Sequence, residues 1–291
     1  MAIIAPPDTL TQVRCDLCGS ASTTVVLRKR GVLIQKVFSI VRCDDCGLVY
    51  VNPRIRDEDI PKLYDDQYYL GQGFDRTTNY AEGASTILLD GVVDTLLSLP
   101  GGVNGKYCLD VGCGNGELVQ RVRNEGAIAF GSETATAAKA LCEKRGIPLL
   151  DLESQGDRLN ESFDIVTATE VIEHVPSPTE FLCSIASYVK PGGIIFLTTG
   201  NWSLVSKIPG TPYVMPEGHL QYFTPVTLTK LFLKANLEPI FEPLNRTWFV
   251  ARTLRAASRG AAPPKLSEGL ARIFRRLAPK CGPFPLAIKP R

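Results

Sequence analysis

The stretch that decides the fold is Leu109-Asp110-Val111-Gly112-Cys113-Gly114-Asn115-Gly116. It joins a strand-like run, KYCLDVG, to a helix-like run, ELVQRVRNEG. Glycines at such a turn let the backbone bend tightly and approach a ligand closely. The stretch therefore predicts a ligand-binding loop inside an α/β domain.

Beyond this loop, strand-like and helix-like runs alternate along the chain. We expect strands in AIAFGSE, IPLLDL, FDIVTATE and IIFLTTGN, and helices in TAAKALCEKRG and PTEFLCSIASYVK, the latter ended by PGG. This rhythm predicts a parallel sheet with helices on both faces. Residues 201–237 read as an insertion that carries a helix in TPVTLTKLFLKANL, and LEPIFEPL reads as a late strand.

Acidic residues stand at the ends of three successive predicted strands. Asp110 precedes the glycines, where dinucleotide-binding fingerprints carry an apolar residue, and an acid there suits a positively charged ligand. Glu133 lies 21 residues after Gly112, close to the ~20 expected for a carboxylate that binds ribose hydroxyls. Asp151 ends the next strand. One acid alone would read as a solvated loop residue, but three in order favour a site at the carboxyl edge of the sheet.

Two matching cysteine pairs, Cys15-Asp-Leu-Cys18-Gly and Cys43-Asp-Asp-Cys46-Gly, lie within residues 1–52. Each pair can turn two thiolates toward one metal ion, and two pairs complete a tetrahedral zinc site with no open position. The alternative is redox chemistry, but a redox pair opens a helix and does not come in duplicate. Strand-like runs between the pairs predict a small β module with structural Zn²⁺. The other five cysteines read as ordinary thiols.

Composition and charge limit the classes of partner. The chain has 44% hydrophobic and 21% charged residues, and no run reaches the ~18 apolar residues of a spanning helix. The N-terminus lacks the pattern of a signal peptide, so we expect the protein to lie in the reducing cytoplasm.

Charge is unevenly distributed along the chain. From Arg252 onward there are ten Lys/Arg and one acid, which leaves 22 basic and 29 acidic residues in the rest of the chain, here called the body. The body therefore has no charge signature for nucleic acid.

Five segments between residues 105 and 202 resemble the successive motifs of class I S-adenosylmethionine methyltransferases: LDVGCGNGEL, GSE, LLDL, FDIVTATEVIEHVPSP and KPGGIIFLTTGN. The resemblance implies a Rossmann-like seven-stranded sheet with a reversed last hairpin, whose final strand is PLAIKP after a basic insertion (252–282). It also implies that S-adenosylmethionine lies across the strand ends. Asp110 would support the loop, Glu133 would bind the ribose, and further contacts would come from Gly112, Cys113, Gly114, Gly116, Asp151 and Leu152.

The N-terminal region resembles bacterial methyltransferases that modify sugars and natural products. The resemblance rests on the cysteine pairs, on CGLVYVNPR and on YDDQYY (Tyr64 to Tyr69). We therefore divide the chain into a zinc-binding module (1–52), a helical linker or lid (53–104) and a methyltransferase domain (105–291). In the linker, Tyr68 and Tyr69 could close over the cofactor or pack on the core.

Methyl transfer to an alcohol or phenol needs a group that removes the acceptor's proton. The chain has two histidines, His174 in EVIEHV and His219 in PEGHLQYF, where the insertion should roof the substrate. Both are candidates for catalysis, with packing or loop contacts as the alternatives, and Glu173 could orient His174 or be a solvated acid. We expect a small-molecule acceptor methylated on oxygen.

Three other functions or partners stay open at the level of sequence. An RNA methyltransferase could use the zinc module and the basic tail, although the acidic body argues against binding to nucleic acid. A zinc-ribbon interaction protein is the other rival function, but such a protein would not need the acids and glycines of the predicted cofactor site.

The basic tail is predicted to contain a helix. One face of this helix is formed by Leu266, Leu270, Ile273, Phe274 and Leu277. The 266–277 helix could dock on the fold, bind nucleic-acid phosphate or lie on the inner face of an anionic membrane.

Overall fold

The structure is a computed structural model that describes residues 10–64, 66–69, 86–99, 101–208, 210–237, 239–243 and 248–254. The predicted tail helix at 266–277, the PLAIKP segment and the basic insertion beyond residue 254 lie outside these ranges. Among the described helices, none is long and apolar enough to cross a membrane.

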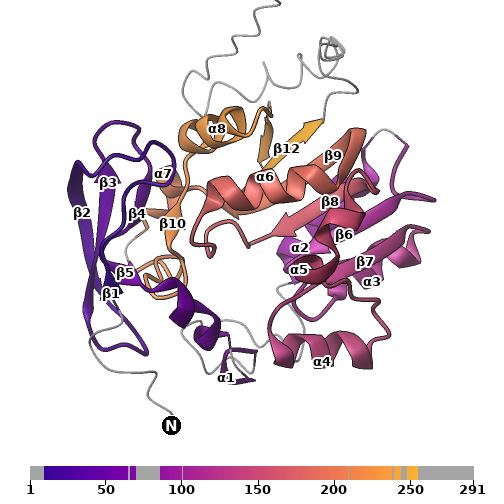
Figure 1. The fold of residues 1–291 in the computed structure, drawn as a ribbon, viewed down its shortest axis with the longest axis horizontal. Coiled ribbons are helices and arrows are strands. Elements are labelled where there is room, and N and C mark those ends of the chain that lie inside the picture. Colours follow the sequence, from indigo (N-terminus) through magenta and orange to yellow (C-terminus); the bar gives the residue numbers. More distant parts are fainter. Residues whose placement is uncertain are drawn as a thin grey trace, which may run out of the picture. The chain divides into compact units, whose positions relative to one another are not determined.

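A six-stranded sheet forms the centre of the described fold, in the order β11-β12-β9-β8-β6-β7 (Figure 1). The four strands around the glycine loop are parallel, as predicted: β6 (Tyr107–Val111), β7 (Ile128–Ser132), β8 (Phe163–Thr169) and β9 (Val189–Gly200). The predicted IPLLDL strand appears as one parallel bridge between Gly131 and Leu149. The Rossmann-like α/β class expected from the sequence is confirmed.

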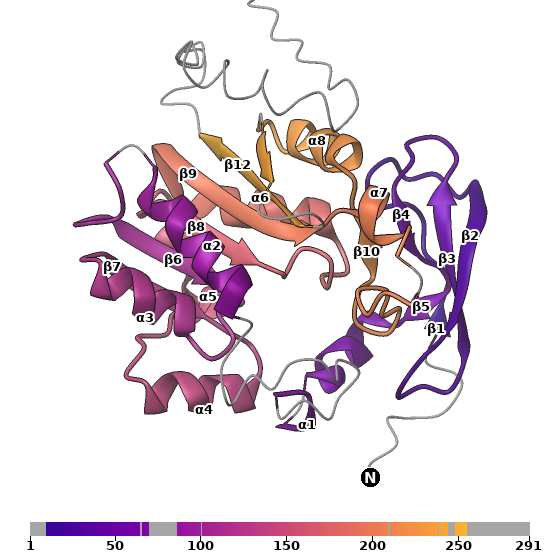
Figure 2. The same cartoon turned by 180° about the vertical axis from the view of Figure 1, so that it is seen from behind.

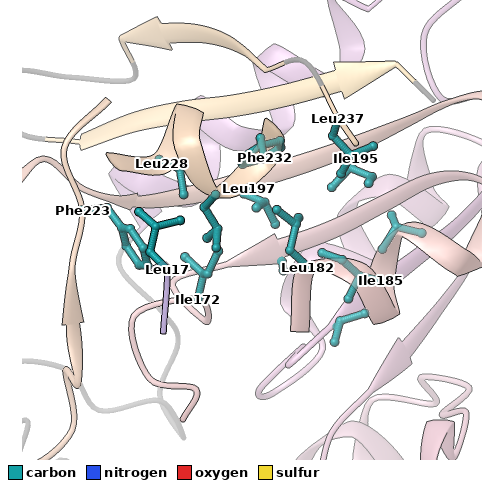
Figure 3. Close-up of a cluster of buried hydrophobic side chains, with 14 of the residues drawn as sticks. Leu17, Ile172, Leu182, Ile185, Ile195, Leu197, Phe223, Leu228, Phe232 and Leu237 are labelled. Atoms are coloured by element: carbon teal, nitrogen blue, oxygen red, sulfur yellow. The ribbon is translucent and has the colours of Figure 1, made fainter. Parts of the chain in front are cut away.

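Helices cover both faces of this sheet because neighbouring residues of a strand point to opposite sides. Ile195 and Leu197 of β9 pack with α6 (Pro178–Tyr188) and α8 (Pro225–Lys234), as Figure 3 shows. Ile194 and Phe196 pack on the other face, with α2 (Thr86–Leu97), α3 (Glu117–Asn124) and α4 (Thr136–Lys144). The two buried clusters hold the helices against the two faces of the sheet.

Two boundaries in this domain differ from the sequence-based expectation. The PGG segment does not end a helix, since α6 stops at Tyr188 and β9 begins at Val189. A register shift between Phe163 and Ile165 of β8 accommodates these extra residues within the strand pair. The reversed strand beside β9 is β12 (Trp248–Leu254), which forms an antiparallel hairpin with β11 (Ile240–Pro243). The run WFVARTL thus forms the reversed strand beside β9, and the expectation for PLAIKP lies outside the described residues.

The N-terminal module is a second, antiparallel sheet in the order β10-β4-β3-β2. Its strands β2 (Thr23–Arg30) and β3 (Val37–Cys43) are the runs predicted between the cysteine pairs, and β4 (Val49–Val51) follows the second pair. The fourth strand, β10 (Gln221–Tyr222), comes from the 201–237 segment, and Figure 2 shows it beside β4. The predicted insertion is thus built into the N-terminal sheet.

Short elements complete the connections. β1 (Leu10–Thr11) pairs with β5 (Arg54–Ile55), so one small sheet crosses the expected boundary at residue 52. The helices of the expected linker are η2 (Asp57–Leu63) and α1 (Asp66–Tyr69), followed by α2. Two further short helices, α5 (Leu152–Gln155) and η3 (Gly156–Leu159), precede β8, and α7 (Trp202–Val205) follows β9.

Candidate functional site

The glycine loop follows β6 and has a backbone that requires glycine. Gly112, Gly114 and Gly116 have φ values of 69°, 55° and 75°, in the left-handed region that L side chains rarely adopt. A Cβ at Gly112 would lie 2.7 Å from Val171, whereas a Cβ at Gly114 would meet nothing within 4 Å. The loop therefore packs closely on the segment after β8 at one glycine and offers open backbone at the next.

Glu133, which follows β7, lies directly against this loop. One carboxylate oxygen accepts a hydrogen bond from the Gly114 amide at 2.9 Å. The other accepts from the amides of Thr134 at 2.7 Å and Ala135 at 2.9 Å. The structure thus brings together the glycines and the acid that the sequence assigned to one ligand.

Asp110 lies near the end of β6, just before the glycine loop. Its side chain is buried and accepts a hydrogen bond from the Thr167 hydroxyl at 2.6 Å. Burial raises the pKa of Asp110 to about 7, the Thr167 hydrogen bond opposes this rise, and the charge of Glu133 adds to it. A buried carboxylate with this environment would be stabilised by a positive charge nearby.

The other predicted cofactor residues occupy different settings. Asp151 is exposed and caps α5, accepting hydrogen bonds from the Ser154 hydroxyl at 2.7 Å and from the amide of Glu153 at 3.1 Å. The Ser154 hydrogen bonds lower the pKa of Asp151. Leu152 is the first residue of that helix. Tyr69 is buried in a cluster with Tyr68 and Ala138 of α4, and its contact with the cofactor stays a prediction.

The three residues predicted for catalysis meet at one point. Glu173 and His174 follow β8, and His219 comes from the 201–237 segment, yet the two imidazole rings are 4.6 Å apart between centroids. One ligand atom from each of the three lies within 4.8 Å of the others, a spacing that is also compatible with a metal ion. The amide of His174 donates to the Val171 carbonyl at 2.9 Å, which ties this group to the segment that touches Gly112.

Burial sets the charge states of this group. Burial raises the pKa of Glu173 to about 7, and burial together with the Glu173 charge raises that of Glu170. The pKa of His219 is lowered well below its usual value, first by burial and then by His174. His219 is therefore a neutral imidazole near pH 7.

A carbonyl and a hydroxyl hold the His174 ring. Nδ1 of His174 lies 3.0 Å from the Gly218 carbonyl oxygen and 2.8 Å from the Tyr64 hydroxyl. A carbonyl can only accept, so a hydrogen bond to Gly218 requires the proton on Nδ1 and leaves the lone pair on Nε2, whereas a hydrogen bond donated by the Tyr64 hydroxyl requires the opposite tautomer. No local pattern in the sequence pointed to Tyr64, Gly218 or Glu170 as members of this group. Tyr64 stood in the tyrosine-rich motif, but no local pattern connects it with a residue 110 positions away.

The four predicted metal ligands also converge. Sγ of Cys15 is 3.4 Å from that of Cys46, and Sγ of Cys18 is 3.5 Å from that of Cys43. All four sulfur atoms lie within 4.8 Å of one another, and all four residues are free cysteines. In each pair the amide of the following glycine donates to the carbonyl of the first cysteine, Gly19 to Cys15 at 2.7 Å and Gly47 to Cys43 at 3.0 Å.

Residues 82–241 match the sequence model of a family described as a methyltransferase domain. The chain belongs to this methyltransferase family. It is a class I enzyme that uses S-adenosylmethionine, in agreement with the open glycine loop and the acids at the strand ends. The expected class of enzyme and its methyl donor are confirmed.

Two relatives of this methyltransferase are named ubiquinone biosynthesis O-methyltransferases. The protein from Aeromonas salmonicida is 32% identical over 162 residues, which cover 50% of this chain and 68% of that one. The protein from Dinoroseobacter shibae is 33% identical over 174 residues, 52% and 70% of the two chains. A similar solved structure is the 1,6-didemethyltoxoflavin-N1-methyltransferase of Burkholderia thailandensis, with a TM-score of 0.52, 15% identity, and coverage of 78% of this chain and 100% of that one. This last likeness concerns the fold alone.

Proposed function

We propose that this methyltransferase transfers the methyl group to a hydroxyl oxygen of a small molecule, with His174 as the general base. The observation that carries the proposal is the Gly218 carbonyl, 3.0 Å from Nδ1 of His174, because a hydrogen bond to this carbonyl places the proton on Nδ1 and the lone pair on Nε2. His174 is partly exposed, whereas His219 is 4% exposed, so an acceptor can approach His174 more readily.

In the proposed step, Nε2 of His174 takes the proton of the acceptor hydroxyl. The oxygen then forms a bond to the methyl carbon as the carbon–sulfur bond breaks, and S-adenosylhomocysteine leaves with the electron pair on sulfur. A positioned base of this kind contributes ~10²–10⁴-fold to the rate. His219 packs edge-on against the ring of His174 and keeps it in place. Glu173 is buried with a carboxylate oxygen within 4.8 Å of a nitrogen of each ring, and in its ionised form it stabilises the imidazolium that forms.

The acceptor is proposed to be a sugar, a natural product or a phenolic metabolite. The resemblance of the N-terminal motifs supports the first two, and the relatives named as ubiquinone O-methyltransferases support oxygen as the methylated atom. The test is transfer of labelled methyl groups to a panel of glycosides and phenols, with total RNA as the competing class. We expect label in a hydroxylated small molecule, and label in RNA alone would contradict the proposal.

We further propose that the four cysteines hold one structural Zn²⁺. Zinc–sulfur bonds of ~2.3 Å in a tetrahedron place neighbouring sulfur atoms ~3.8 Å apart. The measured separations of 3.4 Å and 3.5 Å fit that spacing with small adjustments of the side chains. Because all four ligands are cysteine, the site has no open position for a substrate, and zinc would stabilise the module without taking part in the reaction.

A further inference from the structure

Glu217 is a buried acid whose partners are backbone amides of the N-terminal module. Its side chain is 1% exposed. Its carboxylate accepts hydrogen bonds from three successive amides, those of Val32 at 2.5 Å, Leu33 at 2.9 Å, and Ile34. These amides belong to the loop that joins β2 to β3, more than 180 residues away in the sequence. A buried carboxylate bound in this way is held at a defined position.

The same loop is shaped to receive Glu217. A Cβ at Gly31 would lie 2.6 Å from a Glu217 carboxylate oxygen, so no larger residue fits there without a shift. Nearby, the Lys29 ammonium donates to the Val214 carbonyl at 2.5 Å. Two side-chain contacts therefore fasten residues 214–217 to the β2–β3 hairpin, in addition to the pairing of β10 with β4.

The residues that follow Glu217 contact the candidate base and its neighbour. The carbonyl of Gly218 accepts the hydrogen bond from Nδ1 of His174. The amides of Leu220 and Gln221 donate to the Glu173 carbonyl at 2.8 Å and 3.1 Å. Adjacent residues of one segment thus hold the N-terminal hairpin on one side and the loop after β8 on the other.

We propose that Glu217 is a positioning residue for catalysis. Anchored on the hairpin amides, it fixes the Gly218 carbonyl, and that carbonyl fixes the tautomer and the direction of the His174 ring. The N-terminal module then has a defined role in the reaction, as the support of the general base. This inference rests on the proposed function in one respect, the assignment of His174 as the base.

The test uses the fact that the chain has only two histidines, so a ¹⁵N spectrum of its imidazoles contains two rings. A His174→Gln variant assigns them. In the full-length protein we expect His174 to show a protonated Nδ1 and an unprotonated Nε2. In Glu217→Ala we expect this signature to give way to a mixture of tautomers and the turnover to fall at least tenfold. The affinity for S-adenosylhomocysteine should stay within twofold of the unchanged protein.

Two further variants keep the test decisive. Glu217→Gln preserves the shape but places an amide group against the hairpin amides, so we expect an intermediate spectrum even if Glu217→Ala does not fold. Glu125→Ala, an exposed acid elsewhere, is the matched control and should change nothing. A Glu217 variant that melts at a lower temperature but keeps the His174 signature would overturn the proposal and leave Glu217 a structural residue. If His174→Ala retains turnover while Glu217→Ala still alters the His174 spectrum, the base assignment fails and the positioning contact stands.

Discussion

The carboxylate of Glu133 lies 2.9 Å from the amide nitrogen of Gly114, although the two residues belong to consecutive strand–loop units. This contact joins the end of β7 to Gly114, where an added Cβ would meet nothing within 4 Å, unlike at Gly112 and Gly116. A ligand seated there would meet both the loop backbone and the acid. The relationship makes Glu133 the most informative cofactor residue to change.

Glu133→Ala should reduce the affinity for S-adenosylhomocysteine at least tenfold. The proposed hydrogen bonds from ribose hydroxyls to a charged group contribute ~1.5–3 kcal/mol each, and ~1.4 kcal/mol corresponds to tenfold. Titration calorimetry measures the change, with the exposed Glu143→Ala of α4 as control. Equal affinity in the Glu133 variant and the unchanged protein would remove Glu133 from the list of ribose ligands.

Asp110 should make the ligand-free protein less stable as the pH rises. Its pKa is about 7 in the fold against ~3.9 in an unfolded chain, so the folded state binds the proton more tightly. The stabilisation is complete below pH ~4 and is lost as the pH rises through the folded pKa. Urea unfolding at several pH values between 5 and 8 should show this decline, and Asp110→Asn should make it shallower. A decline of the same slope in the variant would assign it to other groups, such as Glu173.

Cys43→Ser should lose the zinc ion and lower the melting temperature of the protein. Protein purified without added metal should contain about one zinc per chain, because four thiolates form a closed tetrahedral site. Elemental analysis measures the metal, and Cys183→Ser, an exposed cysteine of α6, is the matched control. A disulfide between the two cysteine pairs at full occupancy would rule out the zinc site.

His174→Ala should lower turnover by ~10²–10⁴-fold once an acceptor is identified. His219→Ala should have a smaller effect, because its ring is buried and acts by packing against His174. Single-turnover rates with saturating S-adenosylmethionine separate this effect from cofactor binding. If both variants react at the rate of the unchanged enzyme, neither histidine is the base and Glu173 becomes the candidate.

Residues 266–277, outside the described part of the chain, are predicted to form an amphipathic helix that either docks on the fold or binds an anionic membrane. Each basic residue at an anionic surface contributes ~1 kcal/mol, so Arg272, Arg275 and Arg276 could localise the enzyme reversibly. Co-sedimentation with phosphatidylserine liposomes at low salt decides between the two, with a variant lacking 255–280 as control. Protein that stays in the supernatant would exclude the membrane reading.

Local patterns in the sequence were sufficient for the elements that carry the cofactor loop and the cysteine pairs. The glycines after a β-branched strand, the acids at successive strand ends and the duplicated CxxC each depend on neighbouring residues only. Turn chemistry and side-chain alternation act within a few residues, which is why β2 and β6 could be placed from the sequence. The PGG segment shows the limit, because a register shift against β8 absorbs it into β9.

Only the tertiary structure decided which distant segments complete the site. Nothing in PEGHLQYF predicts that Gln221 and Tyr222 add a strand to the cysteine module, since an edge strand can pair with any extended backbone that packing brings to it. The same holds for Glu217, whose partners are backbone amides and therefore leave no mark in the side chains of Val32 to Ile34. The sequence by itself determined the fold class, the cofactor loop and the four thiols. The packing of the β2–β3 hairpin against residues 214–222 determined how Gly218 meets His174, because hydrogen bonds of buried polar groups are satisfied only once the chain is folded.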